Sequence, residues 1–185
     1  LSIMKPVIFR YGLYAGLAIL VLTAIHFFVV MPNVSWGAAE FAGYLTMILS
    51  MIFVFMGIRY YRDHVNNGFL SFKEGLKLGA MIVLFPAIGF ALFDILYTEV
   101  LNPSWGDEYF GYYVEKIKAS TPADKLDEEL QKLQNNKELF SNPFIQFSLM
   151  AVTVYVIGLI VSIISALTLR RTKPQVAALS KRLIS

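Results

Sequence analysis

Four apolar stretches, each more than twenty residues long, constrain what this chain can fold into. They cover about residues 6–31, 36–60, 72–101 and 143–169. A helix needs about 20 residues to cross a hydrocarbon core about 30 Å thick. Only 16% of the residues are charged, where soluble domains have about 25%. The chain is therefore predicted to be an all-α polytopic membrane protein, a four-transmembrane-helix bundle that forms a single membrane domain over residues 1–185.

The ends of the stretches carry helix-boundary signals. Ser35 is placed to cap the second helix. Ser71 and Glu74 form a capping box at the start of the third, in which the serine and the acid bond each other's backbone N–H groups. Asn66-Asn67-Gly68 predicts the turn between these two helices. Pro86 lies inside the third stretch, where a missing N–H predicts a kink.

The first stretch has an alternative interpretation as a secretory signal, because Lys5 and Arg10 precede most of its apolar residues. Signal cores span about 7–15 residues and end at an Ala-x-Ala-like site. This stretch is longer and no such site follows, so we interpret it as a membrane span that is retained.

Small residues recur every four positions in three of the stretches. This spacing allows two helices to approach closely, either within the chain or between two copies. The predicted helix-packing residues are Gly12 and Gly16, Gly75 and Gly79, and Gly158 and Ser162.

Residues 102–142 form the one sizeable polar segment, with eight acids and five lysines. Thr121-Pro122 has the composition of a helix start. Leu126, Leu130, Leu133 and Phe140 follow at near-helical spacing. This pattern predicts one or two short amphipathic helices that form an extracytoplasmic cap between the third and fourth spans.

The positive charges indicate the orientation in the membrane. Eleven of the sixteen Lys and Arg residues lie at the two chain ends or beside the second connection, and five lie in segment 102–142. Basic flanks of spans stay in the cytoplasm. We therefore expect both termini to be cytoplasmic and loop 102–142 to lie on the outer side of the membrane.

Several short motifs also resemble those of a known family. They are Tyr61-Arg62-Asp63, Asn67-Gly68, Ser71-Phe72, the pair Gly75 and Gly79, and Asn142-Pro143. The chain is similar over nearly its whole length to a family of small four-span bacterial inner-membrane proteins catalogued only as a domain of unknown function, found mostly in the Bacteroides–Flavobacterium group. The resemblance implies this location and topology, and no reaction, ligand or catalytic residue.

Three ionisable residues lie within the apolar stretches, toward their predicted outer ends: His26, Glu40 and Asp94. A charge at membrane depth costs at least about 2.5–3.5 kcal/mol on insertion scales, so such residues are candidate functional groups. One hypothesis is a polar cluster that relays protons, binds a cation or holds a lipid head group. The alternative is that each side chain reaches the outer interface or bonds a neighbouring helix.

The composition argues against several other functions. The chain has no cysteine and two histidines, which removes thiolate chemistry and the common zinc motifs. No nucleophile motif accompanies His26 and Asp94, so we predict no catalytic residue, metal or cofactor. No basic patch indicates a nucleic-acid partner. The predicted partners are the lipid bilayer and a second copy or another membrane protein.

A basic collar is predicted on the inner face. It consists of Arg59, Arg62, Lys73 and Lys77, which we interpret as a topology signal that also contacts anionic lipids. The leading hypothesis for function is a non-enzymatic interaction or accessory subunit. The alternative is a small transporter or an ion or proton pathway that uses the intramembrane acids.

Overall fold

The computed structural model describes residues 3–171 and confirms the predicted fold class. Within this range the chain is helical and forms no strand; the only ladder contact is a single bridge between Leu70 and Arg171. Four helical segments are long and apolar enough to cross a membrane, Lys5–Asn33, Trp36–Val65, Phe72–Leu101 and Pro143–Leu169. These four segments match the four predicted spans. The basic tail residues Lys173, Lys181 and Arg182 lie outside the described range.

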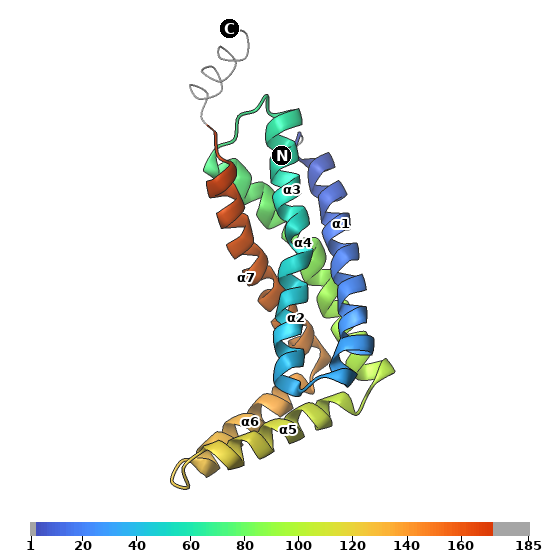
Figure 1. Ribbon diagram of the computed structural model, residues 1–185, viewed down its shortest axis with the longest axis vertical. Coiled ribbons are helices and arrows are strands. Elements are labelled where there is room, and N and C mark those ends of the chain that lie inside the picture. Colours follow the sequence, from blue (N-terminus) through green and yellow to red (C-terminus); the bar gives the residue numbers. More distant parts are fainter. Residues whose placement is uncertain (1–2, 172–185) are drawn as a thin grey trace. The chain divides into compact units, whose positions relative to one another are not determined.

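Seven α-helices make up these segments and the polar connection (Figure 1). They are α1 (Lys5–Ile25), α2 (Trp36–Ser50), α3 (Ile52–Tyr60), α4 (Phe72–Leu96), α5 (Trp105–Ser120), α6 (Leu126–Phe140) and α7 (Pro143–Leu169). The second span comprises α2 and α3, which are separated at Met51. α4 continues through Pro86. The described chain divides into two compact units, one of residues 3–90 and 152–171 and one of residues 91–151.

A π-helical turn lies near the end of each of the first three spans, and in the first span a 3-10 turn, Met31–Asn33, follows it. None of these turns was predicted from the sequence. The π-helical turns cover His26–Val30, Tyr61–Val65 and Tyr97–Leu101. In the second and third, the N–H group after the turn donates to the carbonyl five residues earlier, from Asn66 to Tyr61 and from Asn102 to Tyr97. The 3-10 turn carries the first span beyond its predicted end at about residue 31, and the π-helical turn carries the second beyond its predicted end at about residue 60.

In the first unit, α1 packs against α2, α3 and α4. α1 contacts α2 and α3 along its length. Phe85 of α4 lies against Gly12, where an added Cβ would overlap its ring, and the same ring meets Phe9 edge-on at 5.7 Å. Gly16 is in ordinary contact with the Phe85 backbone. The apolar side chains at this centre, such as Ile19 and Ile82, are fully buried.

α4 and α7 also approach closely within the first unit. A Cβ built on Gly75 would lie 2.9 Å from the Ala166 Cβ, and one on Gly79 would lie 2.6 Å from the Ser162 Oγ. A Cβ on Gly158 would overlap the Val83 side chain. The small residues of these two helices therefore pack against each other inside one chain.

Of the predicted helix caps, the structure contains one. The Glu74 N–H donates to Ser71 Oγ at 3.3 Å and the Ser71 N–H donates to Glu74 Oε2 at 3.0 Å, so the capping box is present. Ser71 Oγ also donates to Glu74 Oε2 at 2.6 Å. Ser35 precedes α2, but its side chain makes no capping bond. The helix start predicted at Thr121 is wrong, because residues 122–125 form a turn and α6 begins at Leu126.

Replacing Ser71 with alanine is expected to lower the free energy of unfolding by about 1 kcal/mol, the usual effect of losing an N-cap. Ser71→Thr is expected to restore most of the loss, since threonine also caps helices and keeps the hydroxyl that donates to Glu74. Chemical unfolding of the detergent-solubilised protein measures both. The matched control is Ser35→Ala, which removes no capping bond and should change stability little; equal effects at the two serines would contradict this assignment.

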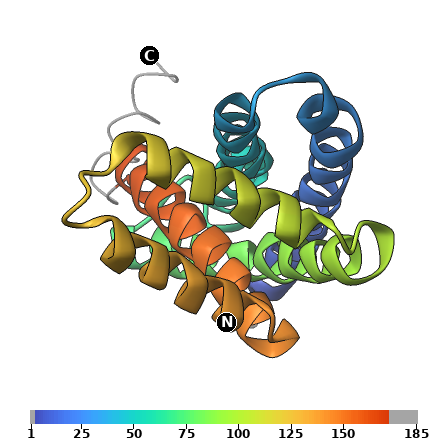
Figure 2. The ribbon, with the colours of Figure 1, turned by 90° about the horizontal axis from the view of Figure 1, so that it is seen from below.

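The second unit holds the ends of two spans and a helical hairpin. α5 and α6 run antiparallel and side by side (Figures 1 and 2). Two contacts join the helices near their span-proximal ends. Lys137 Nζ lies 2.7 Å from Asp107 Oδ1, and the rings of Phe110 and Phe140 are 6.3 Å apart. Loop 102–142, predicted to hold one or two amphipathic helices, forms two helices that pair as a hairpin.

Candidate functional site

A buried polar cluster lies within the second unit, where the end of α4 packs against the start of α7. Asp94 of α4 and Gln146 of α7 are each 5% exposed. Gln146 Nε2 donates to Asp94 Oδ2 at 2.7 Å and to Thr98 Oγ1 at 3.0 Å. A carboxyl, an amide and a hydroxyl from two spans thus share one hydrogen-bonded network.

The bonds made by Thr98 determine which groups of this network donate and which accept. Thr98 Oγ1 donates to the Asp94 backbone carbonyl at 3.0 Å, so its lone pairs accept. Gln146 must therefore turn its NH₂ group toward Thr98, and the second N–H of that group reaches Asp94. Asp94 Oδ2 is the acceptor of this bond. Gln146 is the one side chain of the described chain that hydrogen-bonds the Asp94 carboxyl.

The other two predicted polar residues belong to the first unit. His26 is buried beside α2, with its Nε2 3.5 Å from the position of a Cβ on Gly43. Its Nδ1 has no hydrogen-bond partner in the described chain, and neither has the buried Thr23 Oγ1 one turn earlier. Glu40 is exposed on α2. Among residues 3–171, no group of three or more His, Asp or Glu side chains is arranged to hold a metal ion.

Sequence reasoning missed two members of the Asp94 cluster. Thr98 and Gln146 are uncharged and therefore do not stand out in a search for ionisable residues at membrane depth. A signal does exist for Gln146. It is the one amide within the fourth apolar stretch, and in lipid such a group is expected to bond across helices.

The predicted basic collar contains one residue unlike the others. Arg62 is 7% exposed, and its guanidinium donates to both carboxylate oxygens of Asp63, at 2.6 and 2.9 Å. Its Nη1 donates to the Leu169 carbonyl, the last of α7, at 3.3 Å. The other three side chains are exposed, Arg59, Lys73 and Lys77. Arg62 therefore joins the end of the second span to the end of the fourth.

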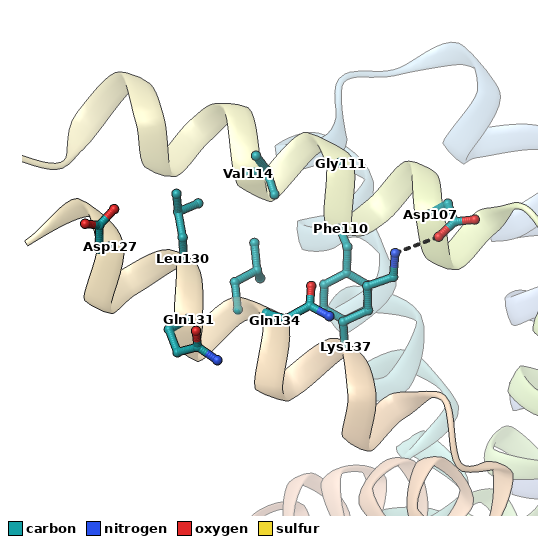
Figure 3. A pocket seen from close by; sticks show the side chains of 10 residues that line it. Asp107, Phe110, Gly111, Val114, Asp127, Leu130, Gln131, Gln134 and Lys137 are labelled. Atoms are coloured by element: carbon teal, nitrogen blue, oxygen red, sulfur yellow. Dashed lines mark hydrogen bonds and ion pairs between the residues drawn. The ribbon is translucent and has the colours of Figure 1, made fainter.

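A cleft runs between α5 and α6 (Figure 3). Its volume is about 670 Å³, and its floor consists of the apolar side chains of Phe110, Val114, Leu130 and Leu133. The ion pair between Asp107 and Lys137 closes one end, and Asp127 lies at the other. Pockets of this size with apolar floors and a few polar groups are typical binding sites.

Two salt bridges lie on the exposed side of α6. Lys132 Nζ lies 2.8 Å from Glu128 Oε1 and 2.9 Å from Glu129 Oε1. The hydrogen bond from Lys132 holds the pKa of the Glu128 carboxyl below its usual range. These groups are exposed, so the pairs contribute little to stability.

The helices and their composition define a four-span membrane protein with a helical hairpin outside the spans. The chain belongs to a family whose model matches residues 10–171 and is described as "Protein of unknown function (DUF4199)". No curated protein and no solved structure matches the chain. The match establishes the family and leaves the function to be argued from the structure.

Proposed function

We propose that this protein is a non-enzymatic interaction or accessory subunit of the bacterial inner membrane, which binds another membrane protein through the α5–α6 hairpin. Both termini are cytoplasmic in this proposal and the hairpin is periplasmic. The bias of Lys and Arg toward the chain ends and the second connection supports this orientation.

The main support for this proposal is that the side chains of the hairpin are incompletely buried. α6 has no buried side chain, and Phe110 is the one buried side chain of α5. The leucines of the α6 stripe, Leu126, Leu130 and Leu133, are partly exposed, and Leu139 of the same helix is 48% exposed. Two helices alone rarely bury enough apolar surface to be stable, so such a seam favours a further helix from a partner.

The small-residue faces contribute less to this proposal than the sequence indicated. Gly75, Gly79, Gly158 and Ser162 contact side chains of their own chain. They therefore serve packing within one copy, and the hairpin is the surface left for a partner.

Purification in a mild detergent tests the proposal. An affinity-tagged protein is expected to retain a companion in constant stoichiometry, either another membrane protein or a second copy. Asp94→Asn should leave this complex intact, because Asp94 lies in the spans and not in the hairpin cleft. Recovery of a monomer without a companion, over several detergents and after cross-linking in intact cells, would contradict the proposal.

A second candidate is a proton or cation pathway, favoured by the Asp94 cluster. The Asp94 carboxyl is buried in a spanning segment and held by a neutral amide. Buried acids of this kind are typical of ion and proton paths. The Pro86 position in α4, buried and without an N–H donor, supplies an adjustable point in the same helix.

If this candidate is right, Asp94→Asn should reduce a proton- or cation-dependent flux in reconstituted vesicles to the background of empty vesicles, since asparagine cannot exchange a proton. Glu99→Gln is the matched control, because Glu99 is an exposed acid of the same span and its replacement should leave the flux unchanged. Equal flux in wild type and Asp94→Asn would exclude a pathway through this carboxyl.

A further inference from the structure

The cleft between α5 and α6 has the dimensions of a helix-binding groove. Along α6 it extends from Asp127 to Lys137, about 15 Å at 1.5 Å per residue. This length corresponds to nearly three helical turns. A groove of that length with an apolar floor matches the helix-in-groove mode of recognition, where residues at i, i+3, i+4 and i+7 of a partner insert.

Gly111 provides the depth of the groove. It lines the cleft from α5, and a Cβ built on it would meet no atom within 4 Å. Packing within the chain therefore does not require a glycine here, in contrast to Gly79 or Gly158. Space at Gly111 is available to a side chain from outside the hairpin.

The charged side chains around the groove indicate which kind of helix could bind there. Asp107 and Asp127 lie at opposite ends, with Lys137 as the one cation of the lining, paired to Asp107. Asp127 has no ion-pair partner within residues 3–171. An occupant with positive charges beside its apolar face would complement this groove.

Two occupants from the same chain are disfavoured. The hairpin of a second copy is acidic, because acids outnumber lysines in both α5 and α6. The basic residues of the C-terminal sequence follow the fourth span, whereas the hairpin precedes it, so the proposed topology puts them on opposite sides of the membrane. Anionic lipid is disfavoured by the acidic rim for the same reason as a second hairpin.

We propose that the α5–α6 cleft binds one amphipathic helix of another membrane protein, with an apolar stripe of about three turns flanked by Lys or Arg. This inference rests on the proposed function, which it makes specific. The bound helix completes a three-helix bundle on the outer side of the membrane. Its apolar side chains fill the space above Gly111, and a basic residue pairs with Asp127.

Site-directed photocross-linking tests the identity of the occupant. The photoreactive residue p-benzoylphenylalanine is placed at Gly111 in the cells that make the protein, and the cross-linked peptide is sequenced by mass spectrometry. The matched control is Gly106, which lies in the same helix, is equally open to an added side chain and does not line the cleft.

The expected product from position 111 is a peptide of another membrane protein with apolar residues at helical spacing and flanking Lys or Arg. Position 106 should give this product at least about tenfold more weakly. A cross-link to a second copy of this chain, a cross-link to lipid, an acidic partner peptide or no cross-link at all would each overturn the inference.

A variant with a large side chain in the groove tests this inference independently of the proposed function. Gly111→Leu is expected to lower the amount of retained partner by about tenfold or more, because the leucine side chain would occupy the space that an anchor residue of the partner needs. Gly106→Leu should retain the wild-type amount, and Asp127→Lys should lower it. If wild type retains a companion that Gly111→Leu retains equally, the groove is not the binding site and the proposed function stands; if wild type retains none, the proposed function itself fails.

Discussion

Gly79→Leu is expected to lower the free energy of unfolding by about 3 kcal/mol, or to prevent folding. A Cβ at this position would lie 2.6 Å from the Ser162 Oγ and 3.1 Å from the Ile58 side chain. Inserting methylene groups into a packed interior typically costs about 1–3 kcal/mol, and here α4 and α7 would have to move apart. The measurement is unfolding by sodium dodecyl sulfate in mild-detergent micelles.

The control for this substitution is Gly37→Leu. Gly37 lies near the start of α2, where an added Cβ meets no atom within 4 Å, so leucine should be tolerated. Comparable stability of the two variants would show that the close approach of α4 and α7 is wrong. The result also bears on function, because it separates packing within one copy from contacts with a partner.

Arg62→Ala is expected to lower the free energy of unfolding by about 2–3 kcal/mol. The substitution removes hydrogen bonds from a charged group to Asp63 and to the last carbonyl of α7, and such bonds are worth about 1.5–3 kcal/mol each at buried sites. Asp63 keeps some access to water, with 29% of its side chain exposed, which limits the loss. Unfolding in the same micelles gives the value.

Arg59→Ala provides the matched comparison. Arg59 lies 3.7 Å from the same carboxylate but has 64% of its side chain exposed, so its loss should change stability by less than about 1 kcal/mol. If the two alanine variants unfold alike, Arg62 does not join the second and fourth spans as described. Arg62→Lys should recover only part of the loss, because an ammonium lacks the planar fork that fits both oxygens.

The spans were predictable because a membrane leaves few alternatives for long apolar stretches. The predicted limits 72–101 and 143–169 agree with the structure, since Ser71 and the Asn142-Pro143 pair mark their starts. The first two spans end later than predicted, at Asn33 and Val65. A 3-10 turn at Met31–Asn33 extends the first span and a π-helical turn at Tyr61–Val65 extends the second, and the sequence pattern predicted neither turn.

The candidate sites were less predictable, because the side chains that a residue contacts depend on which helices pack together. The four collar residues are equivalent by charge alone, yet Arg62 is buried in an ion pair and Lys73 is exposed. Asp94 was identifiable as an acid at membrane depth, whereas its partner Gln146 is 52 positions away. The hairpin cleft likewise requires the pairing of α5 with α6, which the leucine spacing of α6 does not specify.

Single-cysteine labelling tests most directly the claim that the hairpin is outside and the chain end inside. The chain has no cysteine, so Asp127→Cys and Lys173→Cys each provide one reporter site. In intact spheroplasts, a membrane-impermeant maleimide is expected to label Asp127→Cys, and to label Lys173→Cys only after the membrane is opened by detergent. Labelling of Lys173→Cys but not Asp127→Cys in intact spheroplasts would place the hairpin in the cytoplasm and contradict the account.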